Sequence, residues 1–230
     1  MIDLNSLRLS AQIALTTNVT PNLRAACVKV EGVSENNERE TIVGAFFFDG
    51  EYSDDEGEMV DIAVTEISCD FPWMENNEFR DSDTQIQRID YPQEMPLFEE
   101  LVYLRYEPGL EMYRKRLKRE TFSEVSYVTI RLSLQNALLG RVTPNLRDII
   151  VNKRDQNFVV YIYYDKDPST QEMMLEKLIE ADLQEDFSAL CKENGMAIET
   201  KILTLNYPQR PSGHEGGWSV FARYEKISSL

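Results

Sequence analysis

The chain of 230 residues is poor in the residue types from which catalytic and metal sites are built. It has one histidine, His214, and three cysteines, Cys27, Cys69 and Cys191, at unrelated spacings. A lone loop histidine is more often a surface residue than a general base, and an odd set of cysteines indicates neither a disulfide framework nor a zinc site. Glycine-rich phosphate loops are also absent. We therefore expect no catalytic residue, metal or cofactor.

The sequence also lacks a basic leader at its N-terminus and any apolar run of membrane-spanning length. These absences argue against secretion and against a membrane partner. Because the cysteines are unpaired, the expected compartment is the reducing cytoplasm.

What the chain does contain is an internal repeat, which is the first pattern to look for in any sequence. The hexapeptide Val19–Arg24 recurs letter for letter as Val142–Arg147, and Leu7–Ser10 matches Ile130–Ser133 at the same offset. The repeat continues downstream through Phe47–Asp49 and Tyr163–Asp165, Asp70–Phe71 and Asp186–Phe187, Tyr91–Gln93 and Tyr207–Gln209, and Arg105–Glu107 and Arg223–Glu225. Two copies of one domain fill the chain.

The repeat sets the expected domain boundaries. We expect an acidic first repeat over residues 1–109, a basic segment over 110–122 and a second repeat over 123–230. The basic segment contains the run Arg114–Arg119, which is typical of a solvated linker or an extension of the following helix. Binding of phosphate, or contact with the acidic first repeat, is the alternative use of this run.

The net charge of −16 is distributed unevenly between the repeats. Residues 1–109 carry 7 Lys and Arg against 23 Asp and Glu, whereas residues 110–230 carry 17 of each. Such a field repels phosphate backbones and attracts basic partners. We therefore expect no nucleic acid partner and a basic protein partner for the first repeat, or else acidity that only aids solubility.

Each repeat predicts the same order of elements, α-β-β-α-β-β. Apolar residues at three- and four-residue spacings predict the first helix, and β-branched and aromatic runs predict the strands. A capping box, Ser53 with Glu56 in the first copy and Ser169 with Glu172 in the second, predicts the start of the second helix. We expect this helix to bury Ile62 in the first repeat and Met174 and Leu178 in the second.

The connections between successive strands look short, so each pair is expected to form an antiparallel hairpin, with both helices on one face of the sheet. The predicted fold class is α+β, a tandem duplication of an α-β-β-α-β-β two-layer domain with antiparallel four-stranded sheets. We expect the copies to pack as a pseudo-dimer, so that the protein is a monomer with internal pseudo-twofold symmetry.

Four polar positions are shared by the two copies and lie on or just beyond strands: Arg24 and Arg147, Asp49 and Asp165, Tyr91 and Tyr207, and Arg105 and Arg223. One interpretation is a set of cross-strand ion pairs that keep the strands in register. The other is a recognition surface on one face of the sheet.

The tightest acidic cluster supplies the candidate partner-binding residues: Glu51, Asp54, Asp55, Glu56 and Glu58. The cluster does not fit the register of a calcium loop, and acidic residues at a helix start already interact favourably with the helix dipole. A carboxylate–metal hydrolase that uses Asp49, Asp54 and Glu58 is the enzymatic alternative.

Several motifs carry a family resemblance: the hexapeptide Val19–Arg24, then Phe48–Gly50, Asp70–Pro72, Tyr91–Pro92 and Val102–Arg105. This series resembles small single-domain bacterial proteins, some of which belong with the immunity proteins of bacterial toxin systems. The second copy departs from it at Lys166, in place of the glycine, and after Phe187, where the proline is missing. The resemblance implies a non-enzymatic, cytoplasmic inhibitor of a partner protein and transfers no site residue.

Together these patterns predict a non-enzymatic protein-binding module, an immunity-type inhibitor of a basic toxin or of another basic protein. One alternative is a structural or assembly protein that acts through its pseudo-dimer surface. The hydrolase is the other alternative.

Overall fold

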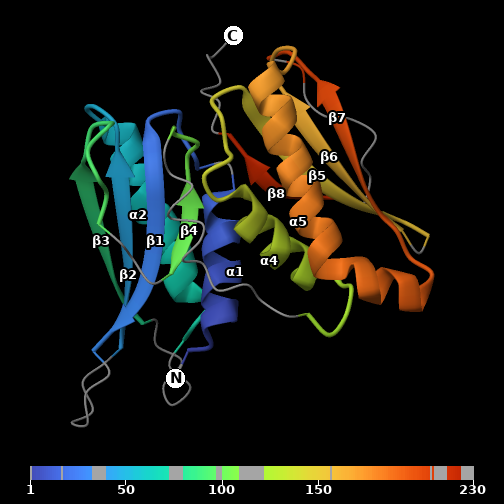
Figure 1. Ribbon diagram of the computed structural model, residues 1–230. Coiled ribbons are helices and arrows are strands. Elements are labelled where there is room, and N and C mark those ends of the chain that lie inside the picture. Colours follow the sequence, from blue (N-terminus) through green and yellow to red (C-terminus); the bar gives the residue numbers. More distant parts are fainter. Residues whose placement is uncertain are drawn as a thin grey trace. The chain divides into compact units, whose positions relative to one another are not determined.

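A computed structural model describes residues 2–16, 18–32, 40–72, 80–96, 100–108, 122–155, 157–207, 209 and 217–223 (Figure 1). The chain forms two compact units. Among the described residues unit 1 runs to Leu104, and unit 2 spans Arg105–Arg223. The basic run Arg114–Arg119 and the lone His214 lie outside the described residues.

The elements occur in the same order in both units. Unit 1 consists of α1 (Leu4–Leu15), β1 (Leu23–Glu31), β2 (Thr41–Phe48), α2 (Asp54–Cys69), β3 (Asp81–Arg88) and β4 (Leu101–Leu104). Unit 2 consists of α4 (Tyr127–Leu138), β5 (Leu146–Arg154), β6 (Asn157–Tyr164), α5 (Thr170–Asn194), β7 (Ile198–Thr204) and β8 (Trp218–Ala222). The predicted α+β class, the tandem duplication and the order α-β-β-α-β-β are confirmed.

Each unit contains one four-stranded sheet, with the order β3-β2-β1-β4 in unit 1 and β7-β6-β5-β8 in unit 2. The central hairpins β1–β2 and β5–β6 are antiparallel, as predicted, and so are the pairs β1–β4 and β5–β8. The pairs β2–β3 and β6–β7 are parallel. The prediction of fully antiparallel sheets is therefore wrong for one strand pair in each repeat.

The physical reason lies in the helix between the second and third strands. A connection that contains a helix can carry the chain back to the end of the sheet where the second strand began, so the third strand pairs parallel to it. The hairpin expected between β3 and β4 does not form, since these strands occupy opposite edges of the sheet.

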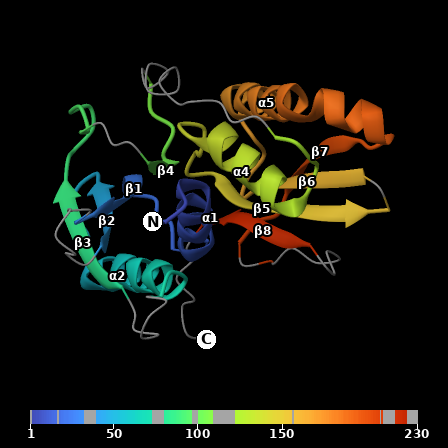
Figure 2. The same ribbon diagram turned by 90° about the horizontal axis from the view of Figure 1, so that it is seen from below.

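Both helices of each unit pack together on one face of its sheet, as Figure 2 shows, which confirms the two-layer prediction. In unit 1, α2 contacts β2 and β3, while α1 contacts β1 and β4. The predicted capping boxes of α2 and α5 are both present. A third box, Ser126 with Thr129 at the start of α4, was not predicted because Thr129 replaces the usual acidic residue.

The two central strands form the core of each unit. All seven residues from Ile42 to Phe48 in β2 are buried, as are those from Phe158 to Tyr164 in β6. Strands that are buried on both faces lose the apolar–polar alternation of a half-exposed strand. The continuous apolar runs in the sequence are therefore explained.

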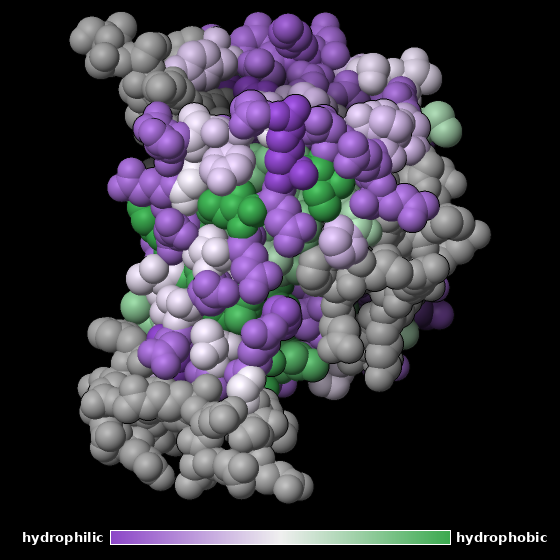
Figure 3. Space-filling view, turned by 90° about the vertical axis from the view of Figure 1, so that its left-hand side faces the viewer, coloured by the Kyte–Doolittle hydropathy of each residue, from purple (hydrophilic) through white to green (hydrophobic). Residues whose placement is uncertain are grey.

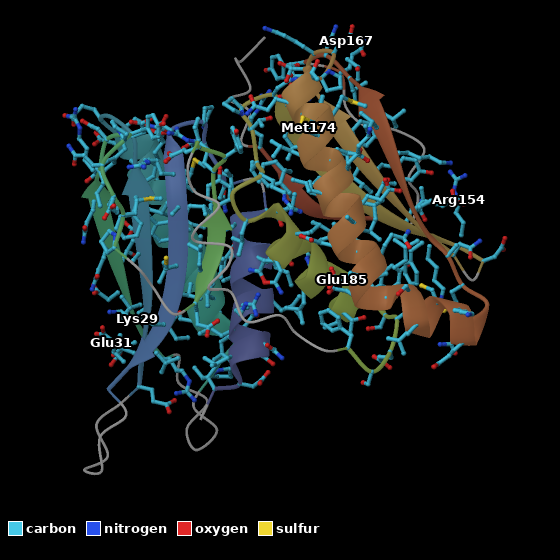
Figure 4. The ribbon with its side chains drawn as sticks, in the orientation of Figure 1. Lys29, Glu31, Arg154, Asp167, Met174 and Glu185 are labelled. Carbon is cyan, nitrogen blue, oxygen red and sulfur yellow. The ribbon has the colours of Figure 1, made fainter. Side chains whose placement is uncertain are left out.

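Three apolar residues predicted to be buried are exposed: Ile62 at 47 %, Met174 at 63 % and Leu178 at 48 %. The prediction for the buried side of α5 also included Leu175, Ile179, Leu183 and Phe187, which are buried and recur at four-residue spacing. Met174 lies on the side of α5 away from the sheet (Figure 4). Hydrophobic type alone did not distinguish these neighbouring helix positions, which differ by about 100° around the helix axis.

Candidate functional site

The arginine of the repeated hexapeptide is a structural clamp. Arg24 is 1 % exposed, and its guanidinium donates hydrogen bonds to the main-chain oxygens of Ile89 and Gln93, the latter at 3.2 Å. It lies over the ring of Tyr91, 5.9 Å from the ring centre. Arg24 therefore fixes the loop that follows β3.

The second repeat builds the same clamp. Arg147 donates to the main-chain oxygens of Leu205 and Gln209, the latter at 2.9 Å, and lies 5.9 Å from the centre of the Tyr207 ring. Both arginines occur where the register of the first strand shifts against the second, Arg24 between Leu23 and Ala25 and Arg147 at the matching position. A bulge of this kind re-aims a side chain, and no local sequence pattern predicts it.

The shared aspartates hold the same loops from the other side. Asp49 accepts a hydrogen bond from the Tyr91 amide at 3.0 Å, and Asp165 accepts one from the Tyr207 amide at 2.7 Å. The Tyr207 amide, opposed by burial and helped by the charges of Arg223 and Arg147, lowers the pKa of Asp165. The Asp165 carboxylate is therefore held in its charged form by the fold.

The remaining polar residues of the hexapeptide tie it to the second helix. In unit 2, Thr143 donates to Glu172 at 2.7 Å and Asn145 donates to the same carboxylate at 3.2 Å. Burial alone would raise the pKa of Glu172, but donation from the Ser169 amide, Thr143 and Asn145 lowers it below its usual value.

In unit 1, Glu56 has the equivalent place. Asn22 donates to its carboxylate at 3.4 Å, and the Ser53 amide does so at 2.8 Å. Burial acts to raise the pKa of Glu56, yet hydrogen bonds from Ser53, Thr20 and Asn22 lower it. Glu56, predicted to contact a partner, is thus occupied by the capping box and the hexapeptide.

A further shared pair links the two helices of each unit. Ser10 of α1 donates to Asp70 at 2.7 Å, and Ser133 of α4 donates to Asp186 of α5 at 2.6 Å. Ser133 is completely buried. This pair accounts for the polar match between the repeats at Ser10 and Ser133, both of which are buried.

The last shared pair, Arg105 and Arg223, differs between the repeats in its contacts. Arg105 forms an ion pair with Glu107 at 2.9 Å. Arg223 lies 3.6 Å from Asp165 and also donates to the main-chain oxygen of Pro144. Most of the shared polar set therefore bonds to loop main chain, which neither of the two predicted interpretations described.

Because the shared polar residues stabilise the fold, we expect a partner-binding site among the residues that differ between the repeats. On the loop and helix that follow β2, unit 1 carries five exposed carboxylates, which we call the acidic face: Glu51, Asp54, Asp55, Glu58 and Asp61. With Ser53 aligned on Ser169, the corresponding residues of unit 2 are Asp167, Thr170, Gln171, Met174 and Lys177. One scaffold thus presents five acids in one copy and a neutral, partly apolar set in the other.

Four members of the acidic face belong to the predicted set, and Asp61 is an addition. The sequence prediction stopped at Glu58 because it followed the run of letters, whereas Asp61 lies one helical turn further on the exposed surface. The helix α2 carries no Lys or Arg in its sixteen residues, so no basic side chain of its own neutralises this face.

Glu51, a member of the acidic face, is paired with an arginine. Arg88, at the end of β3, contacts Glu51 and lies 2.8 Å from Asp90. The hydrogen bonds from Arg88 and the Gly50 amide lower the pKa of Asp90 to about 2, and the two carboxylates raise that of Arg88. The side chain of Glu51 remains 85 % exposed, and it therefore stays accessible to a partner.

The described residues contain no group of three His, Cys, Asp or Glu side chains that could hold a metal ion. Asp49, proposed as a metal ligand in the hydrolase alternative, is bonded to the Tyr91 amide instead. Cys27 is buried in β1, and burial raises the pKa of its thiol, which keeps it protonated and unreactive. In the part of the chain that the structure describes, no helix combines the length and apolar character needed to cross a membrane.

The fold and this surface define a class: a duplicated α+β protein whose shared polar residues maintain the scaffold and whose surface charge has diverged between the copies. The model of the MafI2 immunity protein family matches residues 4–107 and again residues 127–225. The chain therefore belongs to the MafI2 immunity protein family, with two copies of the family domain. No curated protein matches it.

Proposed function

We propose that the protein is an immunity-type inhibitor that binds a basic toxin through the acidic face of its first repeat. Membership of an immunity protein family supports the inhibitor role and implies a protein partner. The observation that carries the finer proposal is the contrast between the five carboxylates of unit 1 and the residues at the same positions of unit 2, which include one acid and one lysine and carry no net charge.

The physical chemistry of such a surface fits an inhibitor. Clustered carboxylates raise the association rate with a basic partner and favour the orientation in which opposite charges meet. In a toxin that acts on a phosphate-containing substrate, they would also occupy the sites meant for phosphates. Occupation of the phosphate sites would explain how binding alone inhibits the toxin, without any catalytic residue.

The acidic face is also held in place before a partner arrives. The capping box of Ser53 and Glu56 fixes the first turn of α2, and Asn22 fixes Glu56 in turn. Asp54, Asp55 and Glu58 therefore project from a helix start whose backbone is already ordered. Such preorganisation reduces the entropy lost on binding.

We expect a neighbouring gene to encode the toxin, and the test uses the toxin domain that this gene encodes. Its activity is measured with increasing amounts of the wild-type protein and of a variant in which Asp54→Asn, Asp55→Asn and Glu58→Gln are combined. We expect the wild type to inhibit and the triple variant to need at least about tenfold more protein, a loss of about 1.4 kcal/mol.

A matched control removes three exposed carboxylates from unit 2: Glu185→Gln, Glu193→Gln and Glu199→Gln. The control should inhibit like the wild type. Equal loss in both variants would show that only net charge matters, and no loss in either would exclude the acidic face as the binding surface.

A further inference from the structure

The strand β3 is an edge of the sheet of unit 1. It pairs with β2 on one side and is the last strand in the order β3-β2-β1-β4, with no strand of the described residues on its outer side. Five of its eight residues are exposed. The opposite edge strand, β4, has only four residues, three of them buried. Among the strands of this sheet, β3 is therefore the accessible edge.

The hydrogen bonds of this sheet indicate which main-chain groups face outward. The Ile89 amide donates to the Phe48 oxygen at 2.9 Å, so the odd-numbered residues of β3 direct their main-chain groups toward β2. In a parallel pair, successive residues direct these groups to opposite sides. Ser82, Thr84 and Ile86 therefore direct their amide and carbonyl groups to the outer edge.

Acidic side chains flank this edge on both faces of the sheet. On the helix face, a Cβ added at Gly57 would lie 3.9 Å from Ile86, so this side of α2 borders β3, and Asp54 and Asp61 lie one turn before and after Gly57. Because Ile86 faces the helix, the alternating residues Asp81 and Asp83 lie on the opposite face. Both are exposed. Figure 3 views unit 1 from its β3 side and shows a mainly hydrophilic surface.

The equivalent edge of unit 2 lacks this charge pattern. In β7, Lys201 takes the place of Gln85, and Lys177 of α5 takes the place of Asp61. Glu199 retains the acid of Asp83. The nearby lysines offset it, so a basic segment has no electrostatic preference for this edge.

We propose that the outer edge of β3 binds an extended, basic segment of the partner protein as an additional strand. The main chain of that segment pairs with Ser82, Thr84 and Ile86, and its Lys or Arg side chains reach Asp54 and Asp61 on one face and Asp81 and Asp83 on the other. Strand addition of this kind takes its affinity from main-chain hydrogen bonds and its specificity from alternate side chains. The identity of the partner as a toxin rests on the proposed function.

Charges on an edge strand also protect a sheet against aggregation, and the test must separate this role from binding. The probe is a fluorescent peptide with the eight-residue length of β3. Its sequence is Lys-Lys-Thr-Thr repeated twice, which places lysines on both faces of an added strand. A second peptide has the same sequence but is N-methylated throughout, so that it keeps the charge and cannot donate main-chain hydrogen bonds. Fluorescence anisotropy at low and high salt gives both affinities.

We expect the wild type to bind the first peptide about tenfold or more tightly than the methylated one, since several main-chain hydrogen bonds are lost. Thr84→Pro removes an outward amide without removing a bond to β2, a position where an edge strand tolerates proline. For this variant, the difference in affinity between the two peptides should largely disappear. Thr84→Ala keeps the amide, so its affinities for the two peptides should differ as they do for the wild type.

Equal binding of the two peptides to the wild type, or unchanged discrimination in Thr84→Pro at an unchanged melting temperature, would overturn the strand-addition proposal. If the melting temperature of Thr84→Pro falls, the affinities of the wild-type protein for the two peptides decide the test instead of this variant. The toxin assay separates the two proposals: inhibition that Thr84→Pro leaves intact refutes strand addition alone. If the protein does not inhibit the toxin domain but still binds the two peptides with different affinities, only the toxin proposal is refuted.

Discussion

At the scale of residues, several members of the repeated hexapeptide make contacts that stabilise the fold. Leu23 is in the core, Arg24 clamps the loop after β3, and Thr20 and Asn22 hold the capping glutamate of α2. Each of these roles has an equivalent in unit 2. The identity of the two hexapeptides thus follows from packing and hydrogen bonding rather than from a shared binding site.

The clamp predicts a large effect of a conservative change. Arg24→Lys keeps the positive charge but cannot place two donors on the Ile89 and Gln93 oxygens, so it should lower the free energy of unfolding by about 2 kcal/mol. Urea denaturation measures this, with Arg88→Lys as a control, because Arg88 is half-exposed and its ion pairs should contribute little to stability. An unchanged urea midpoint for Arg24→Lys would show that the clamp does not stabilise the fold.

Two buried glutamates of α5 predict opposite effects. Folding lowers the pKa of Glu172, so its contribution to stability is present above the pKa of the unfolded carboxyl and is lost as the pH falls through the folded value. Burial and the charge of Glu180, opposed by Thr200 and Lys177, raise the pKa of Glu176. Its stabilising contribution is present below the unfolded pKa and is lost as the pH rises through the folded pKa.

At neutral pH, Glu172→Gln should therefore lower the free energy of unfolding, by about 1–3 kcal/mol because hydrogen bonds to a charged group are lost. Glu176→Gln should raise the melting temperature at neutral pH and leave it nearly unchanged in acid. Thermal melts across the acidic and neutral range check both signs. The same sign for both variants at neutral pH would contradict this assignment.

At the scale of elements, the approach of α2 to β2 depends on glycine. A Cβ at Gly44 would lie 2.3 Å from Val64 of α2 and 2.9 Å from Phe46. Gly44→Ala should therefore destabilise unit 1 by about 1–3 kcal/mol through overpacking. A Cβ at Gly57 meets only ordinary contacts from 3.7 Å outward, so Gly57→Ala should stabilise the helix by about 0.5–1 kcal/mol.

The two substitutions form a matched pair, since each adds one methyl group to unit 1. Chemical denaturation should separate them by more than 1 kcal/mol, as the sum of the two estimates requires. Gly44→Ala at wild-type stability would show that α2 can move away from β2 at little cost.

The elements also show how far a sequence alone can lead. Local signals predicted the order of the elements, the capping boxes at Ser53 and Ser169, and the central hairpins, since each depends on residues close together in the chain. The partner of β3 was predicted wrongly, because nothing in Asp81–Arg88 specifies whether it pairs with β2 or with β4. The bulges at Arg24 and Arg147 depend on loops about sixty residues away and left no local signal.

The candidate site was predictable to a similar degree. Counting charges in each repeat located the acidic cluster, and alignment of the repeats showed that unit 2 lacks it. The capping role of Glu56 was predicted, but its contact with Asn22 was not, because Asn22 lies far from Glu56 in the sequence. Asp61, Asp81 and Asp83 were missed because they join the surface through helix and sheet geometry rather than through sequence proximity.

At the scale of the whole molecule, the two copies share one fold but differ in net charge. The excess of acidic residues lies entirely in residues 1–109. The packing of the two copies as a pseudo-twofold pair stays a prediction. The central claim is that the acidic face of unit 1, rather than the chain's net charge, recruits the partner.

The association rate constant with the toxin domain tests this claim most directly. Stopped-flow mixing at increasing ionic strength compares the wild type with a variant that combines Asp54→Lys, Asp55→Lys and Glu58→Lys, and with a control that combines Glu185→Lys, Glu193→Lys and Glu199→Lys in unit 2. Both variants change the net charge equally, and thermal melts confirm that both are folded.

We expect the wild-type rate constant to fall at least about tenfold from low to high salt, because screening removes electrostatic steering. The variant of unit 1 should associate at least about tenfold more slowly at low salt and lose most of the salt dependence, whereas the control should stay within about threefold of the wild type. Equal rates and equal salt slopes for the two variants would contradict the claim.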